Sequence, residues 1–107
     1  MGKLVKLVKL NNLEYNPNRD PAVYRRVPKH PFRIQALLSG SGAAEAHVEI
    51  DGVRQHAQKI TLPDTYTCEV SFDTPGLRIA TLIVEDASGQ SFRRDLPLDV
   101  MEHAWVG

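Results

Sequence analysis

From Phe32 to Val100 the chain alternates apolar and polar residues in short runs that are separated by turn residues. Alternation with period two places successive side chains on opposite faces of an extended backbone, as in a strand with one buried face. No segment repeats apolar residues at helical intervals over three turns. The pattern therefore predicts an all-β protein with little helix.

The turn signals divide this region into six expected strands. Asp51-Gly52 is the strongest hairpin signal, because both residues tolerate the positive φ of a type I′ turn. The polar character of Val53–Leu62 predicts an edge strand, and Pro97 predicts an edge or a bulge in the last strand. The expected strands cover residues 32–38, 45–50, 53–62, 66–72, 77–85 and 92–100, with further turns at 39–42, 63–64, 73–76 and 86–89.

The N-terminal region differs from the rest of the chain in its composition. The Val and Leu content of residues 3–10 favours a strand, while a helix of that length would be unstable in isolation. Residues 11–31 contain four of the seven prolines, which restrict the backbone and exclude a long regular element. We therefore expect an extended proline-rich arm at 1–31, a β-domain at 32–100, and a tail at 101–107 that frays unless Trp105 docks.

Residues 75–89 resemble the late strand and turn of bacterial immunoglobulin-like domains, including polycystic-kidney-disease-type repeats and adhesion-related modules. In those families a Pro-Gly turn opens a strand that ends in Val-x-Asp-x-x-Gly, and Val84, Asp86 and Gly89 match that ending. The segment 46–52 is similar to the middle strand and hairpin of such modules. The resemblance covers residues 32–100 and implies an immunoglobulin-like antiparallel β-sandwich of about seven strands.

The inward-facing positions of these strands form the expected core, in which side chains from two packed layers meet. They are Phe32, Ile34, Leu38, Val48, Ile50, Tyr66, Val70, Phe72, Leu82, Val84, Leu96 and Leu98.

The length and net charge of the chain exclude several classes of protein function. A chain of 107 residues fits one domain. Thirteen Lys plus Arg balance thirteen Asp plus Glu, so the strongly basic surface typical of nucleic-acid binding is missing from the chain as a whole. No run approaches the roughly 20 apolar residues of a membrane span, and lysines interrupt the N-terminal apolar run that a signal peptide needs. We expect a cytoplasmic protein if the chain is complete and an extracellular one if it is an excised module.

The chain shows no recognisable catalytic apparatus, so we expect no enzyme activity, cofactor or metal. Glu45, His47 and Glu49 share one strand face, but the pattern is typical of a solvated outer face rather than of metal ligands. Cys68 is the only cysteine and lies in the inward series of its strand, where a thiol is expected to be buried and unreactive.

Four cations gather in a short loop, and Tyr24 and Phe32 flank them. This candidate basic patch consists of Arg25, Arg26, Lys29 and Arg33. It could contact an acidic protein surface or, less in keeping with the neutral chain, nucleic acid. Simple solvation of a charged loop is the alternative.

The strand at 77–85 has apolar residues on both faces. Ala80, Leu82 and Val84 alternate with a second series, Leu77, Ile79 and Ile83, which we take as a candidate interface. The N-terminal arm at 3–31, or a partner or second copy of the chain, would cover this second series, because large apolar patches are uncommon on free monomers. The remaining alternative is a tolerated pair of exposed side chains.

These observations predict a non-catalytic protein-interaction or structural module, a building block of a larger assembly, with a protein partner or a second copy as its ligand. The alternatives are a ligand- or carbohydrate-binding module that uses Tyr15, Tyr24 and Trp105, or an accessory subunit of an enzyme complex.

Overall fold

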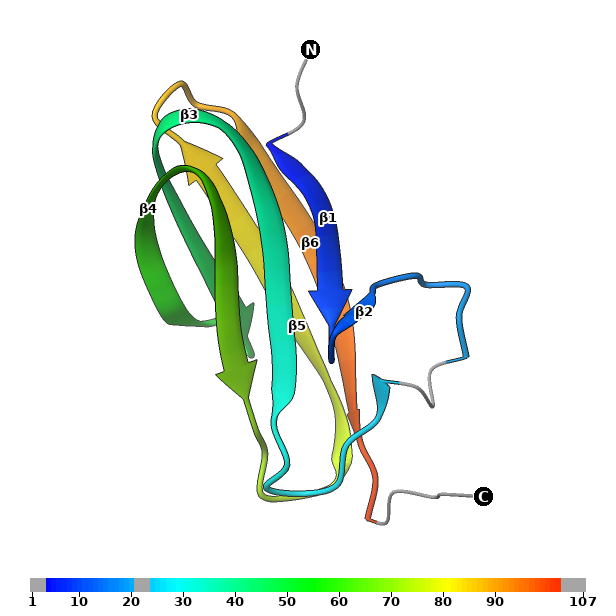
Figure 1. The fold of residues 1–107 in the computed structure, drawn as a ribbon. Helices are drawn as coiled ribbons and strands as arrows, with labels where there is room; N and C mark the ends of the chain where they lie inside the picture. The colour runs from blue at the N-terminus through cyan, green and yellow to red at the C-terminus, as the bar shows by residue number, and fades with distance from the viewer. Residues whose placement is uncertain (1–3, 21–23, 103–107) are drawn as a thin grey trace.

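A computed structural model describes residues 4–20 and 24–102 and has an all-β, antiparallel fold (Figure 1). The strands belong to one sheet in the order β2-β1-β3-β5-β6, and β4 pairs with the other edge of β3. They are β1 (Val5–Leu10), β2 (Leu13–Glu14), β3 (Phe32–Ile50), β4 (Val53–Val70), β5 (Gly76–Asp86) and β6 (Ser91–Val100).

The turn predicted at 39–42 is wrong, because β3 continues through it as a bend. Gly40 and Gly42 have φ of 116° and 88°, values that L side chains rarely adopt. The register with β4 shifts between Leu38 and Gly42, and β4 bends alongside. Pro63 lies opposite this register shift. The regular hydrogen bonding between the two strands is already interrupted there, so the backbone N–H that proline lacks costs little. The predicted strand end at 63–64 is therefore also wrong.

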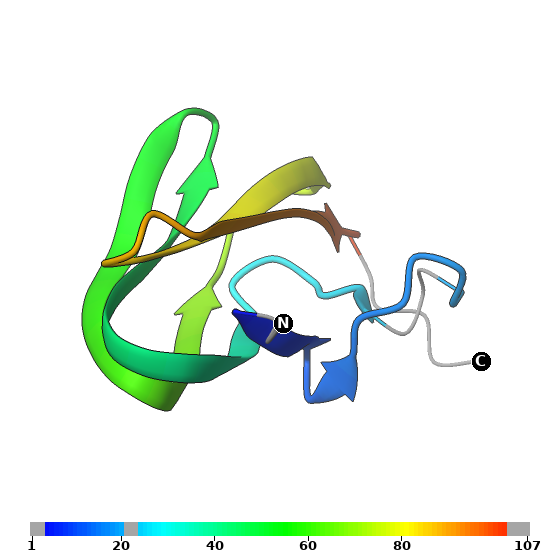
Figure 2. The same ribbon diagram turned by 90° about the horizontal axis from the view of Figure 1, so that it is seen from above.

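The bend makes the sheet curl into a half-barrel. β1 pairs with the first half of β3 and β5 with its second half, both on the edge opposite β4. The two halves consequently lie opposite each other across the core, and the curl stays open between β1 and β6 (Figure 2). The all-β prediction is confirmed, but the structure does not confirm two separate sheets of about seven strands.

The core follows the predicted inward series closely. Eleven of the twelve expected residues are buried, and Phe72 is half-buried against the same cluster. Tyr66 is the largest fully buried side chain among the described residues, and its hydroxyl donates a 2.8 Å hydrogen bond to the His56 carbonyl. Period-two alternation thus identified the buried face of each long strand.

The N-terminal segment adds a strand to the sheet. Val5–Leu10 is extended as predicted, and Leu4, Val8 and Leu10 belong to the main core cluster. Asn11 and Asn12 have φ of 56° and 70°, the positive pair that a two-residue hairpin between β1 and β2 requires. Residues 4–14 of the expected arm are therefore part of the β-domain.

The edge strand expected at Val53–Leu62 is confirmed. Within the described ranges β4 pairs only with β3. β6 pairs with β5 along its length, and Pro97 lies exposed on it opposite Ile79. These pairings leave strand edges at β4, β6 and the start of β1.

Candidate interaction site

Two of the three candidate interface residues are exposed. Leu77 is 64% exposed and Ile79 is 44% exposed, whereas Ile83 is only 8% exposed and does not contribute to a surface. Ile79 and Pro97 are partners in the β5-β6 register, so they lie side by side on the outer face of the sheet. We call Leu77, Ile79 and Pro97 the outer patch.

The difference between these residues has a simple cause. β5 pairs with β3 only from Ala80 to Asp86, so Ile83 lies between His47 on β3 and Arg93 on β6. Leu77 and Ile79 lie beyond the end of β3 and, among the described strands, have a neighbour on one side only.

A cavity of about 300 Å³ adjoins the outer patch. The loop after β2 forms one wall, and β5 and β6 form the other. It is lined by Tyr15, Asn16, Pro17, Arg19, Tyr24, Arg25, Leu77, Pro97 and Asp99. Part of the expected arm therefore approaches Leu77 without covering it, and charges of both signs surround the apolar surface.

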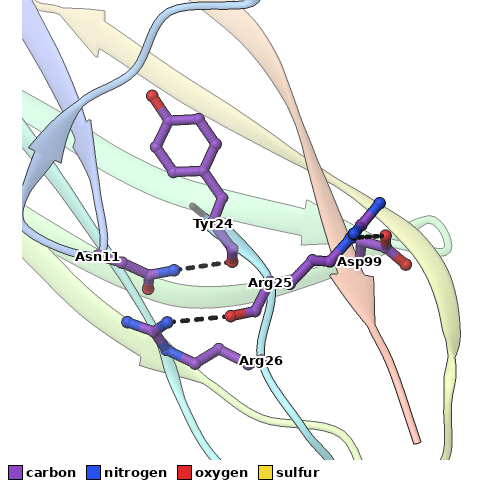
Figure 3. Close-up of polar contacts among 5 residues, drawn as sticks. All are labelled: Asn11, Tyr24, Arg25, Arg26 and Asp99. Atoms are coloured by element: carbon purple, nitrogen blue, oxygen red, sulfur yellow. Dashed lines mark hydrogen bonds and ion pairs between the residues drawn. The ribbon is translucent and has the colours of Figure 1, made fainter. Parts of the chain in front are cut away.

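Arg25 and Arg26 of the candidate basic patch are engaged within the domain. The Arg25 Nε donates to Asp99 Oδ2 at 2.8 Å, and the Arg26 Nη1 donates to the Arg25 carbonyl at 3.0 Å (Figure 3). In the same view the Asn11 Nδ2 donates to the Tyr24 carbonyl at 2.8 Å. These contacts fasten the loop to the β1-β2 hairpin on one side and to β6 on the other.

Lys29 and Arg33 remain exposed at separate places. The Lys29 backbone has φ of 71°, and its N–H donates to the Phe72 carbonyl at 2.7 Å. Arg33 lies on β3 opposite Glu69 of β4. The four cations thus do not form one free cationic surface, and the arrangement favours a mainly structural role for the first two.

The acidic and histidine residues of β3 are partnered with one another or with β4. His47 is buried, and its Nε2 lies 3.0 Å from Glu49 Oε2. Glu45 forms an ion pair with Arg54. The part of the chain that the structure describes contains no group of three His, Cys, Asp or Glu side chains suited to a metal ion. His47 is less exposed than the solvated face expected from sequence, because it packs beside Ile83.

Cys68 is buried, as predicted, and burial raises the pKa of its thiol. The nucleophilic form is the thiolate, so the native thiol should be protected by both protonation and lack of access. Because the pKa of the Cys68 thiol is higher in the folded than in the unfolded state, the protonated thiol contributes its full stabilisation below the ordinary pKa of cysteine. That contribution is lost as the pH rises from the ordinary pKa through the raised one.

Alkylation checks this protection. We expect iodoacetamide at pH 8 to modify native Cys68 at least about a hundredfold more slowly than the same chain in denaturing urea. Mass spectrometry at timed intervals measures both rates. Equal rates would contradict the buried position.

Tyr15 and Tyr24, the described aromatic residues of the carbohydrate alternative, do not form an exposed platform. Tyr24 is buried, and its hydroxyl donates to the Glu14 carbonyl at 3.0 Å. Tyr15 is half-buried, with its ring centroid 5.5 Å from that of Tyr24. Trp105 lies outside the described residues.

Sequence reasoning missed a second surface, where Lys6, Tyr15, Phe92 and Arg94 line a cavity between β1 and β6. These residues are far apart in the sequence and share no motif, so only the curl of the sheet brings them together.

Comparisons of the chain with protein-family models, with curated proteins and with solved structures find no match. The described residues include no helix with the length and apolarity needed to cross a bilayer.

Proposed function

We propose that the chain is a non-catalytic interaction module, a building block of an assembly, and that a second copy of the chain covers its outer patch. The supporting observation is the adjacency of exposed Leu77, Ile79 and Pro97 beside a cavity. Removing such apolar surface from water is favourable by roughly 25 cal/mol per Å².

The charges around the outer patch favour a second copy as the occupant. Arg19, Arg25 and Asp99 line the adjoining cavity, so the surrounding surface carries both signs. A two-fold contact sets a patch against itself and therefore needs a self-complementary surface. The formal net charge of zero also limits long-range repulsion between copies.

The immunoglobulin-like resemblance and the accessory-subunit alternative stay predictions. For carbohydrate binding, the buried position of Tyr24 removes one of the three aromatic side chains on which that alternative depended. Contact through the outer patch needs none of them.

Sedimentation velocity over a concentration series tests the proposal. We expect the mass to rise from that of one 12.0 kDa chain toward twice that value. Leu77→Asp should weaken association at least about tenfold, because it would bury a carboxylate in the contact. Ala87→Asp is the matched control, since Ala87 is an exposed apolar residue directly after β5, at the end of the strand opposite Leu77.

A wild-type chain that stays monomeric at every concentration would contradict the proposal. So would an Ala87→Asp variant that weakens association as much as Leu77→Asp. Circular dichroism of both variants should match the wild type, because both positions are exposed.

A further inference from the structure

The open side of the half-barrel is bordered by two strands that do not pair with each other. β1 and β6 run in the same direction there, on opposite sides of the opening (Figures 1 and 2). A cavity of about 500 Å³ lies between them, which we call the seam. It is lined by Leu4, Val5, Lys6, Leu7, Val8, Glu14, Tyr15, Gln90, Ser91, Phe92 and Arg94.

Both borders of the seam are strand edges. β2 pairs only with Lys9 and Leu10 of β1, and the Val8 carbonyl accepts from the Tyr15 N–H at 2.7 Å. Val5–Leu7 therefore has a strand partner on the β3 side only, within the described residues. β6 has β5 on one side along Ser91–Arg94. Such edges carry backbone N–H and C=O groups that can pair with another chain.

The chain already fills one end of this opening with an extended segment of its own. The Arg26 N–H donates to the Asp99 carbonyl at 3.3 Å, and the Met101 N–H donates to the Arg26 carbonyl at 3.0 Å. These bonds form a parallel bridge between Arg26 and Val100 of β6. On the other side, Asn11 holds the Tyr24 carbonyl (Figure 3). The β6 edge is thus able to accept an added segment.

The charged side chains that line the seam indicate what kind of segment could bind there. Arg94 occupies the inward row of β6, opposite fully buried Leu82, yet it is exposed because the barrel is open there. Its guanidinium carbon lies 5.5 Å from the centroid of the Phe92 ring. Lys6 is exposed on the other border. A segment that closes the seam would enclose these cations, which is favourable only if it brings carboxylates to them.

We propose that the seam binds an extended acidic peptide segment of a partner protein by strand addition. The segment pairs with Val5–Leu7 and with Ser91–Arg94 and directs a carboxylate side chain toward Arg94. Because β1 and β6 run in the same direction, one segment can pair with both in the same sense. Alternate side chains of the segment point inward, where the half-buried rings of Tyr15 and Phe92 receive apolar residues.

The other long edge is less suited to strand addition. β4 bends where its register with β3 shifts, and Pro63 lies at this bend. A second irregularity occurs at His56, which has φ of 54°, where two β4 residues oppose His47. Bulges and proline both hinder edge-to-edge pairing. This proposal concerns a different surface from the outer patch and does not depend on self-association.

Selection from a random nine-residue peptide display library on the full chain tests the proposal. We expect the selected peptides to be rich in Asp and Glu and poor in proline. Synthetic copies should bind Arg94→Glu at least about tenfold more weakly than wild type, by fluorescence anisotropy. Arg93→Glu carries the same charge change on the outer face of the same strand, opposite Ile83, and should bind normally. Lys6→Glu replaces Arg94→Glu if the latter fails to fold.

Amide chemical shifts and hydrogen exchange locate the bound peptide. Slower exchange at Val5–Leu7 and Ser91–Arg94 supports strand addition. The proposal is overturned if no peptide is selected, if the selected peptides lack acidic residues, or if Arg93→Glu weakens binding equally. Competition by inorganic phosphate at the peptide's own concentration would also overturn it, because it would indicate a simple anion site.

Discussion

Replacing Phe32 by alanine should lower the free energy of unfolding by about 3–5 kcal/mol. Phe32 begins β3 and is fully buried, with its ring packed edge-on against Phe72 at a centroid separation of 6.3 Å. The substitution removes a large apolar group and leaves a cavity that the surrounding strands fill only in part. Urea unfolding followed by far-ultraviolet circular dichroism measures the change.

The loss should be severe because single domains are stable by only about 5–15 kcal/mol in total. Val53→Ala is the control, since Val53 is 56% exposed beside the β3-β4 hairpin turn. It should change the free energy of unfolding by less than about 0.5 kcal/mol. Equal effects of the two substitutions would show that the buried face of β3 has been assigned to the wrong residues.

Replacing Asn11 by alanine should cost about 2–4 kcal/mol, although Asn11 lies in a turn. Its Nδ2 donates to the Tyr24 carbonyl at 2.8 Å, and its Oδ1 accepts from the Arg33 N–H at 3.0 Å. The residue is buried and has φ of 56°, which alanine adopts only with strain. The variant therefore loses one buried and one partly buried hydrogen bond and strains the β1-β2 hairpin. Thermal and urea unfolding measure the total.

Asn11→Gly separates the two causes. Glycine tolerates the positive φ, so the difference between the glycine and alanine variants reports the backbone strain, expected to be about 1 kcal/mol. The remaining difference from wild type reports the lost side-chain hydrogen bonds. Hydrogen exchange at the Arg26 amide should accelerate in both variants, because Asn11 positions the adjacent loop. A glycine variant as stable as wild type would contradict a role for the Asn11 amide group.

The candidate interface residues show what an alternating sequence pattern can predict and what it cannot. Leu77, Ile79 and Ile83 are odd-numbered positions of one strand, so alternation placed their side chains on the same face of the sheet, in agreement with the β5-β6 register. Exposure nevertheless differs, because β3 ends at Ile50, opposite Ala80, and so flanks only the later part of β5. The length of a neighbouring strand is a long-range property that no local alternation specifies.

Two segments of turn residues show the same limit of local sequence patterns. Asp51-Gly52 closes the β3-β4 hairpin as expected, whereas the glycine-rich segment at 39–42 bends a continuous pair of strands. Both segments permit positive φ, and β4 remains paired with β3 on either side of the bend. Whether such residues reverse the chain or bend it therefore depends on the partner strand.

By itself the sequence determined that the protein is built from strands, which face of the strands after Phe32 points inward, and that Cys68 belongs to the interior. These are properties of period two and of side-chain hydrophobicity, and both act within a few residues. Only the tertiary structure decided that one curled sheet holds all the strands, that Ile83 is covered, and that Arg94 lies beside Phe92 in an opening bordered by β1. Strand partners are chosen by hydrogen bonding and packing between distant segments, so the open edges and the surfaces they create become defined only once the chain has folded.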